Sequence, residues 1–181
     1  MKFETSLKLI QAMIAEPFRE YNINQLSSLS GISLATTYRT LKQMEKLKML
    51  LKRENGIEKL YRLNLQNSFT RKFLEAISIS QRRKFFTQNP KYFGILSKLK
   101  QKLKGLVELI LLDFNNEKLE LFVLSDKIQN KNLNLRENIS LTFLTEAELK
   151  KTLKQNKNLI VLYGESKFWD LVSQLTNGLI L

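Results

Sequence analysis

Six polar residues between positions 33 and 43 are the part of this sequence best suited to chemistry, and that chemistry is hydrogen bonding. They combine hydroxyl groups, an amide and two cations, and they are Ser33, Thr36, Tyr38, Arg39, Lys42 and Gln43. Thr37, Leu41 and Met44 recur at helical spacing and are expected to face a core, which leaves the polar residues after Ser33 to face outward. Ser33 itself stands where a helix N-cap should stand. An outward face of this composition predicts contacts with base edges and phosphates.

Most of the residue types used in catalysis are absent. The chain contains no cysteine and no histidine. This composition excludes disulfides, thiolate metal sites and acid–base catalysis by histidine, and it removes the commonest ligand of transition metals. A site for Mg²⁺ built from oxygen atoms alone is still possible in principle. We therefore expect no catalytic residue, no bound metal and no cofactor.

The six polar residues are expected to sit on the second helix of a helix-turn-helix. Residues 24–30 form a short helical pattern, and residues 34–47 form a longer one. Gly31 and Ile32 lie between them, and glycine tolerates the positive φ that such a turn requires.

A hairpin is expected to follow. The runs 49–52 and 57–63 favour strands, and Asn55-Gly56 between them is a strong signal for a hairpin turn. The basic residues beside this turn are expected to contribute affinity for nucleic acid, and they are Lys52, Arg53 and Lys59. Helix, turn, helix and hairpin in this order predict DNA binding.

The same residues resemble those of winged helix-turn-helix transcription regulators. Residues 36–46 resemble the recognition helix of that family, and Tyr61-Arg62-Leu63 resembles its second wing strand. The resemblance implies that double-stranded DNA is the partner and that Tyr38 and Arg39 reach base edges in the major groove. Two roles for Arg39 stay open, a bidentate contact to guanine or a contact to phosphate alone. Lys48 departs from the family, because many relatives place a glycine there.

Positive charge is concentrated in the first 105 residues. Of the formal charge of +13, residues 1–66 carry +5, residues 67–105 carry +9 and residues 106–181 carry −1. A basic region of this kind supplies affinity for phosphate that does not depend on sequence. Lysine-rich helices that are merely solvated are the alternative explanation for the segment 67–105.

The pattern of elements predicts an α+β fold in three segments. Residues 1–66 are expected to be the winged helix-turn-helix, 67–105 two basic connecting helices, and 106–181 a small α/β domain. The run 106–113 is almost continuously apolar and predicts a buried strand. Thr145 with Glu148 three residues later predicts a capping box.

The segment 106–181 resembles the minimal nucleotidyltransferase domain. The likeness rests on the order of its elements, on Thr145-Glu146-Ala147-Glu148-Leu149, and on the run 159–164. Transferases of this type need a Gly-Ser turn and two carboxylates one residue apart, which bind Mg²⁺. This sequence has Asp113-Phe114 at the turn and places Lys118 and Glu120 at the two carboxylate positions. A lysine there disfavours a divalent cation, so the domain is expected to be inactive. An unrelated α/β domain that dimerises or binds a ligand is the alternative.

These observations favour a cytoplasmic, DNA-binding transcription regulator that is not an enzyme. An active nucleotidyltransferase with an appended nucleic-acid-binding module is the alternative, and a protein-interaction module is the third hypothesis. A homodimer is expected, since two-fold operators match two-fold proteins, and a small-molecule effector is possible. The expected dimer interface is the helix 68–86, through Phe69, Phe73, Ile77, Phe85 and Phe86. No stretch approaches the roughly 18–20 apolar residues of a membrane span.

Overall fold

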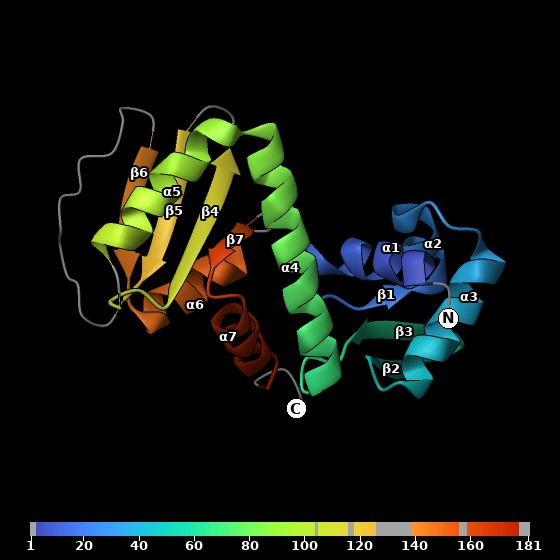
Figure 1. Ribbon diagram of the computed structural model, residues 1–181. Helices are drawn as coiled ribbons and strands as arrows, with labels where there is room; N and C mark the ends of the chain where they lie inside the picture. The colour runs from blue at the N-terminus through green and yellow to red at the C-terminus, as the bar shows by residue number, and fades with distance from the viewer. Residues whose placement is uncertain (1–2, 104, 116–117, 126–138, 156–158, 178–181) are drawn as a thin grey trace. The chain divides into compact units, whose positions relative to one another are not determined.

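The computed structural model shows a mixed α+β protein with seven helices and two small sheets among the residues that it describes (Figure 1). These residues are 3–103, 105–115, 118–125, 139–155 and 159–177. The chain divides into two compact units, residues 1–71 and residues 72–181.

The first unit places three helices against a three-stranded sheet with the strand order β1-β3-β2. Its elements in chain order are α1 (Phe3–Ile14), β1 (Tyr21–Asn22), α2 (Ile23–Ser30), α3 (Leu34–Lys46), β2 (Leu50–Asn55) and β3 (Glu58–Leu63). The core of this unit comes from apolar residues at helical spacing and from the ends of the strands, and it includes Leu9, Ile10, Met13, Leu26, Leu41, Met44, Met49, Tyr61 and Leu63.

Strands β2 and β3 form the expected hairpin, but its turn lies one residue later than predicted. Asn55 pairs with Glu58, so the two loop residues are Gly56 and Ile57. The predicted Asn55-Gly56 tip is therefore wrong in detail. Gly56 has a φ of +61°. Ile57 does not have a positive φ, because Lys48 is the single non-glycine residue with one in the described part of the chain. A positive φ at the first loop residue alone is the pattern of a type II′ turn, which favours glycine at that position.

The second unit holds most of α4 (Ser68–Gln88) and a four-stranded mixed sheet with the order β6-β5-β4-β7. Its other elements are α5 (Pro90–Lys102), β4 (Leu109–Asn115), β5 (Lys118–Leu124), β6 (Ile139–Leu144), α6 (Glu146–Gln155), β7 (Leu159–Tyr163) and α7 (Glu165–Asn177). Strand β4 pairs antiparallel with β5 and with β7, while β5 and β6 are parallel. The apolar run 106–113 predicted a buried strand, and it overlaps β4, one of the two inner strands of this sheet. The buried strand is confirmed, but it begins at Leu109, three residues later than predicted.

Helices cover both faces of this sheet. One core cluster joins Phe85 of α4 and Leu96 and Leu99 of α5 to alternate residues of the strands, such as Leu112 and Leu121. Helix α5 crosses that face in Figure 1. The intervening strand residues lie on the opposite face, on the side where α6 and α7 contact the strands.

Several tight contacts fix the helices of the second unit. The guanidinium of Arg82 on α4 pairs with Glu165 at the start of α7 and donates to the Leu162 carbonyl at 3.0 Å. The indole N–H of Trp169 donates to the Ser78 hydroxyl at 3.0 Å. Gly164 has a φ of +81°, and a Cβ there would lie 2.1 Å from the Glu108 carbonyl oxygen, so this turn requires glycine.

Helix α4 buries part of the expected dimer interface within the chain itself. Ile77 is 3% exposed and Phe85 is 6% exposed, whereas Phe69 is 52% exposed. Ile77 and Phe85 therefore cannot supply a surface for a second copy, and including them in the interface was wrong. An amphipathic pattern does not say whether its apolar face is covered by the same chain or by another one.

Candidate nucleic-acid interface

The turn between α2 and α3 is fixed by local hydrogen bonds. Asn22 caps α2 by accepting from the Gln25 amide at 2.9 Å, and the Asn22 amide donates to the Gln25 side chain at 3.0 Å. Gly31 ends α2 with a φ of +66°, as its position predicted. The hydroxyl of Ser27 donates to the Ile32 carbonyl at 2.6 Å. These contacts hold the start of α3 in one orientation relative to α2.

Ser33 occupies the N-cap position of α3, as predicted, but its hydroxyl makes no capping bond to the backbone. The hydroxyl instead donates to the Thr36 hydroxyl at 3.0 Å, and the Ser33 carbonyl accepts from the Thr37 amide at 2.8 Å. Two of the predicted interface residues, Ser33 and Thr36, are therefore joined to each other.

The body of α3 divides into a buried face and an exposed face as the sequence predicts. Thr37, Leu41 and Met44 have no exposed surface. On the opposite face, Tyr38 is 42% exposed, and the exposed polar side chains beside it are Arg39, Lys42 and Gln43.

The charged groups of Arg39 and Lys42 are available for contacts with nucleic acid. Arg39 Nε donates to the Ala35 carbonyl at 3.3 Å, and its terminal nitrogens bond to none of the described residues. Lys42 Nζ lies 5.4 Å from the centre of the Tyr38 ring, within the range of a cation–π contact. Lys46 was not among the predicted interface residues, and it is exposed one turn further along the same face. Its spacing of four from Lys42 was the signal that could have identified it.

The hairpin separates the three predicted wing cations onto two faces. Residues directly opposite in an antiparallel pair share a face, and the register pairs Lys52 with Tyr61 and Glu54 with Lys59. Lys52 and Lys59 therefore lie on the face that carries the buried Tyr61 ring. Arg53 pairs with Leu60 in the register and lies on the other face.

Two of these three cations are already paired with carboxylates. Lys52 Nζ lies 2.8 Å from Glu54, and the hydrogen bond that Lys52 donates to this carboxylate raises the pKa of Lys52 above its usual value. Arg53 lies 2.5 Å from Glu20, a residue 33 positions earlier in the chain. Lys59 makes no ion pair with any residue in the described ranges, so it is the wing cation best able to meet a phosphate.

The candidate catalytic region of the second unit has little that could hold a metal. The register places Asp113 on β4 directly opposite Glu120 on β5. Asp113 is 7% exposed, and Glu120 accepts a hydrogen bond from Thr142 at 3.4 Å. Lys118 precedes Glu120 by two residues on β5, as the sequence placed it. Within the described ranges, no three carboxylate, histidine or cysteine side chains gather into a possible metal site.

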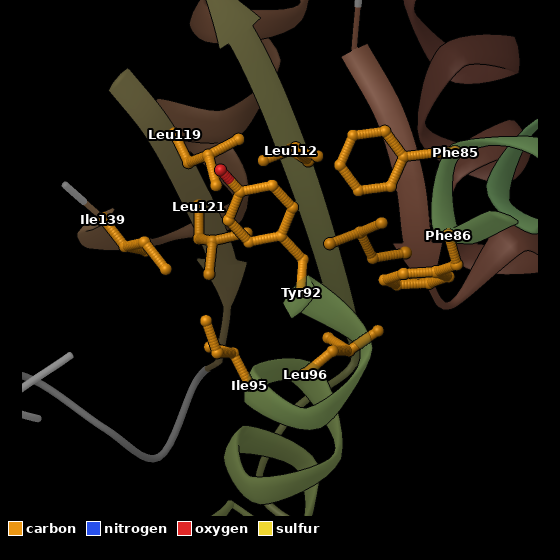
Figure 2. A pocket seen from close by; sticks show the side chains of 10 residues that line it. Phe85, Phe86, Tyr92, Ile95, Leu96, Leu112, Leu119, Leu121 and Ile139 are labelled. Carbon is orange, nitrogen blue, oxygen red and sulfur yellow. The ribbon is translucent and has the colours of Figure 1, made fainter. Parts of the chain in front are cut away.

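A small cavity opens on the other face of this sheet, between its strands and the helices α4 and α5 (Figure 2). Its volume, about 20 Å³, is enough for roughly one water molecule. Its lining is apolar except for the hydroxyl of Tyr92, and it includes the rings of Phe85 and Phe86. This cavity has neither the space nor the cations that a nucleoside triphosphate would need.

Comparisons with known proteins give no family for this chain. No protein-family model matches the sequence, and a search of curated proteins found no match. Among the described helices, none has the length and apolar character needed to span a membrane.

Proposed function

We propose that this protein is a DNA-binding transcription regulator whose first unit is a winged helix that reads double-stranded DNA. The observation that carries the proposal is the row of exposed cations on α3, formed by Arg39, Lys42 and Lys46. None of the three forms an ion pair with a described carboxylate. Cations left unpaired along one face of a helix are suited to phosphate and to guanine edges.

The surroundings of α3 also support this function. A short turn joins α2 to α3, and a hairpin follows with the unpaired cation Lys59 near its tip. In the winged helix this order of elements places one helix in the major groove and the hairpin beside it. The excess of positive charge in residues 1–105 adds attraction to phosphate over the whole region.

We further propose that the second unit is a nucleotidyltransferase-like domain that lacks transferase activity and serves dimerisation or ligand sensing. Its support is the order α5-β4-β5-β6-α6-β7, together with the hairpin pairing of β4 with β5. Lys118 stands where such enzymes carry a metal-binding carboxylate, and the Gly-Ser turn is missing. These two departures make the enzyme the weaker candidate, so the protein is proposed not to be an enzyme and to need no cofactor.

Selection of bound duplexes from random DNA, followed by fluorescence anisotropy, tests the proposal. Arg39→Ala is expected to lower affinity for the selected duplex at least tenfold, within the roughly 1–3 kcal/mol of one bidentate base contact. Arg19→Ala removes the same charge from an exposed site paired with Glu16, and it is the matched control. A palindromic motif would support the homodimer. Failure to bind any duplex at low salt would refute the proposal, and equal losses on selected and random DNA would limit Arg39 to phosphate.

A further inference from the structure

The first two turns of α3 expose two apolar side chains that the proposed DNA contacts do not use, Leu34 and Ala35, beside the ring of Tyr38. Leu34, the first residue of the helix, is 48% exposed. Tyr38 lies one turn later on the same side and is 42% exposed, and the small residue Ala35 is exposed beside them. In contrast, Leu41 and Met44 on the same helix are fully buried.

An isolated exposed leucine needs no explanation in a folded protein, so the position of Leu34 is what gives it meaning. In helices that enter the major groove, the N-terminal residues contact base edges. Arg39, an exposed cation, follows Tyr38 directly, and the exposed Lys42 lies one turn after Tyr38. An apolar edge bordered by unpaired cations is complementary to a polyanion that carries apolar groups, and it is less suited to an apolar protein surface.

The major groove contains one apolar group on its base edges, the C5-methyl of thymine. We infer that Leu34, together with the ring of Tyr38, contacts thymine methyl groups and makes this protein select sites containing thymine beside the base that Arg39 reads. This inference rests on the proposed DNA-binding function and specifies the class of sequence that the same helix recognises.

The local geometry supports a defined placement of both apolar groups. The Lys42 ammonium lies 5.4 Å from the centre of the Tyr38 ring, a contact that restricts the ring to the side of Lys42. Gly31 and Ile32, which precede Leu34, are held by the hydrogen bonds that end α2. Because the backbone before Leu34 is held in place, its side chain can contact the same methyl group in every complex.

Replacing thymine by uracil in the selected duplex tests the inference, because uracil removes the methyl group and keeps every hydrogen-bonding group. The duplex is synthesised in both forms, and each is titrated with the full-length wild-type protein and with Leu34→Ala. The wild type is expected to bind the uracil form about fourfold more weakly for each contacted methyl group. Leu34→Ala is expected to lose that preference wholly or in large part.

Leu47→Ala is the matched control, since it makes the same truncation at a residue 45% exposed at the other end of α3. It is expected to keep the full preference for thymine. Tyr38→Phe is expected to keep it as well, because the ring remains. Equal wild-type affinity for both duplexes would overturn the inference while leaving DNA binding intact. A Leu34→Ala variant with the wild-type ratio would also overturn it, whereas failure to bind any duplex would defeat the proposed function itself.

Discussion

The amide of Met49 donates a hydrogen bond to the carbonyl of Met44 at 2.9 Å, across the C-terminal end of α3. The Lys48 amide donates to the Glu45 carbonyl at 2.8 Å inside this bond, and Lys48 has a φ of +55°. Together the two bonds form a Schellman motif, which usually places glycine at the left-handed residue. Met44 and Met49 stand at the two positions where this motif commonly carries an apolar contact, and both are fully buried.

Lys48→Gly is therefore expected to stabilise the protein. A side chain in the left-handed region costs roughly 1 kcal/mol, which glycine avoids. Urea denaturation followed by circular dichroism measures the change. Lys46→Gly is the matched control, since it removes the same charge from within the helix and is expected to destabilise by about 1 kcal/mol. A destabilised Lys48→Gly variant would contradict the cost assigned to this conformation.

The hairpin predicts unequal roles for Lys59 and Arg53 in DNA binding. Lys59→Gln is expected to weaken binding to all duplexes and to reduce the slope of log affinity against log salt by about 0.9 unit. Arg53→Gln is expected to change the slope much less, because Arg53 is paired with Glu20 and lies on the other face of the hairpin. Anisotropy titrations between 50 and 200 mM salt, roughly the range in which such slopes are measured, give both values. Equal slopes for Lys59→Gln and the wild type would remove Lys59 from the interface.

Glu146 is expected to make stability depend on pH in the acid range. Hydrogen bonds from Lys150 at 2.8 Å and Lys167 at 3.1 Å lower the pKa of Glu146 below its ordinary value of 4.5. The resulting stabilisation is present above that value and is lost as the pH falls through the folded-state pKa. Because Glu146 is partly exposed, the gain is roughly 0.5 kcal/mol.

The free energy of unfolding of Glu146→Gln should therefore be lower than that of the wild type at neutral pH. The difference should vanish once the pH has fallen below the folded-state pKa of Glu146. The fluorescence of Trp169, which is the single tryptophan and lies in the second unit, reports this transition. Lys167→Met removes one of the two hydrogen bonds to Glu146, so it should also reduce the loss of unfolding free energy at acid pH. Parallel pH profiles for Glu146→Gln and the wild type would show that Glu146 does not contribute.

The second unit is expected to transfer no nucleotide. Phosphoryl transfer depends on positioned metal ions and on charge neutralisation, and Lys118 replaces one of the carboxylates that would hold Mg²⁺. Incubation with labelled nucleoside triphosphates, Mg²⁺ or Mn²⁺, and cellular RNA and protein should give no incorporation. Incorporation that disappears in Glu120→Ala would establish the enzyme instead.

Local sequence determined the features whose partners lie within a few residues. Thr37, Leu41 and Met44 are buried together because helical geometry alone brings them to one face. Thr145 forms the predicted capping box, with its amide donating to the Glu148 carboxylate at 2.9 Å. Gly31 adopts the positive φ that its place between two helical patterns indicated. Each of these depends on backbone geometry over at most a few turns.

The tertiary structure decided the features whose partners are far apart in the chain. Arg53 was one of three apparently equivalent wing cations until the strand register placed it on another face and near Glu20. Ile77 and Phe85 looked available for a dimer because their own sequence does not show which elements cover them. Lys48 adopts a conformation that its residue type disfavours, where the chain leaves α3 and continues to the buried Met49. Register and burial arise from contacts between distant segments, which a local pattern cannot specify.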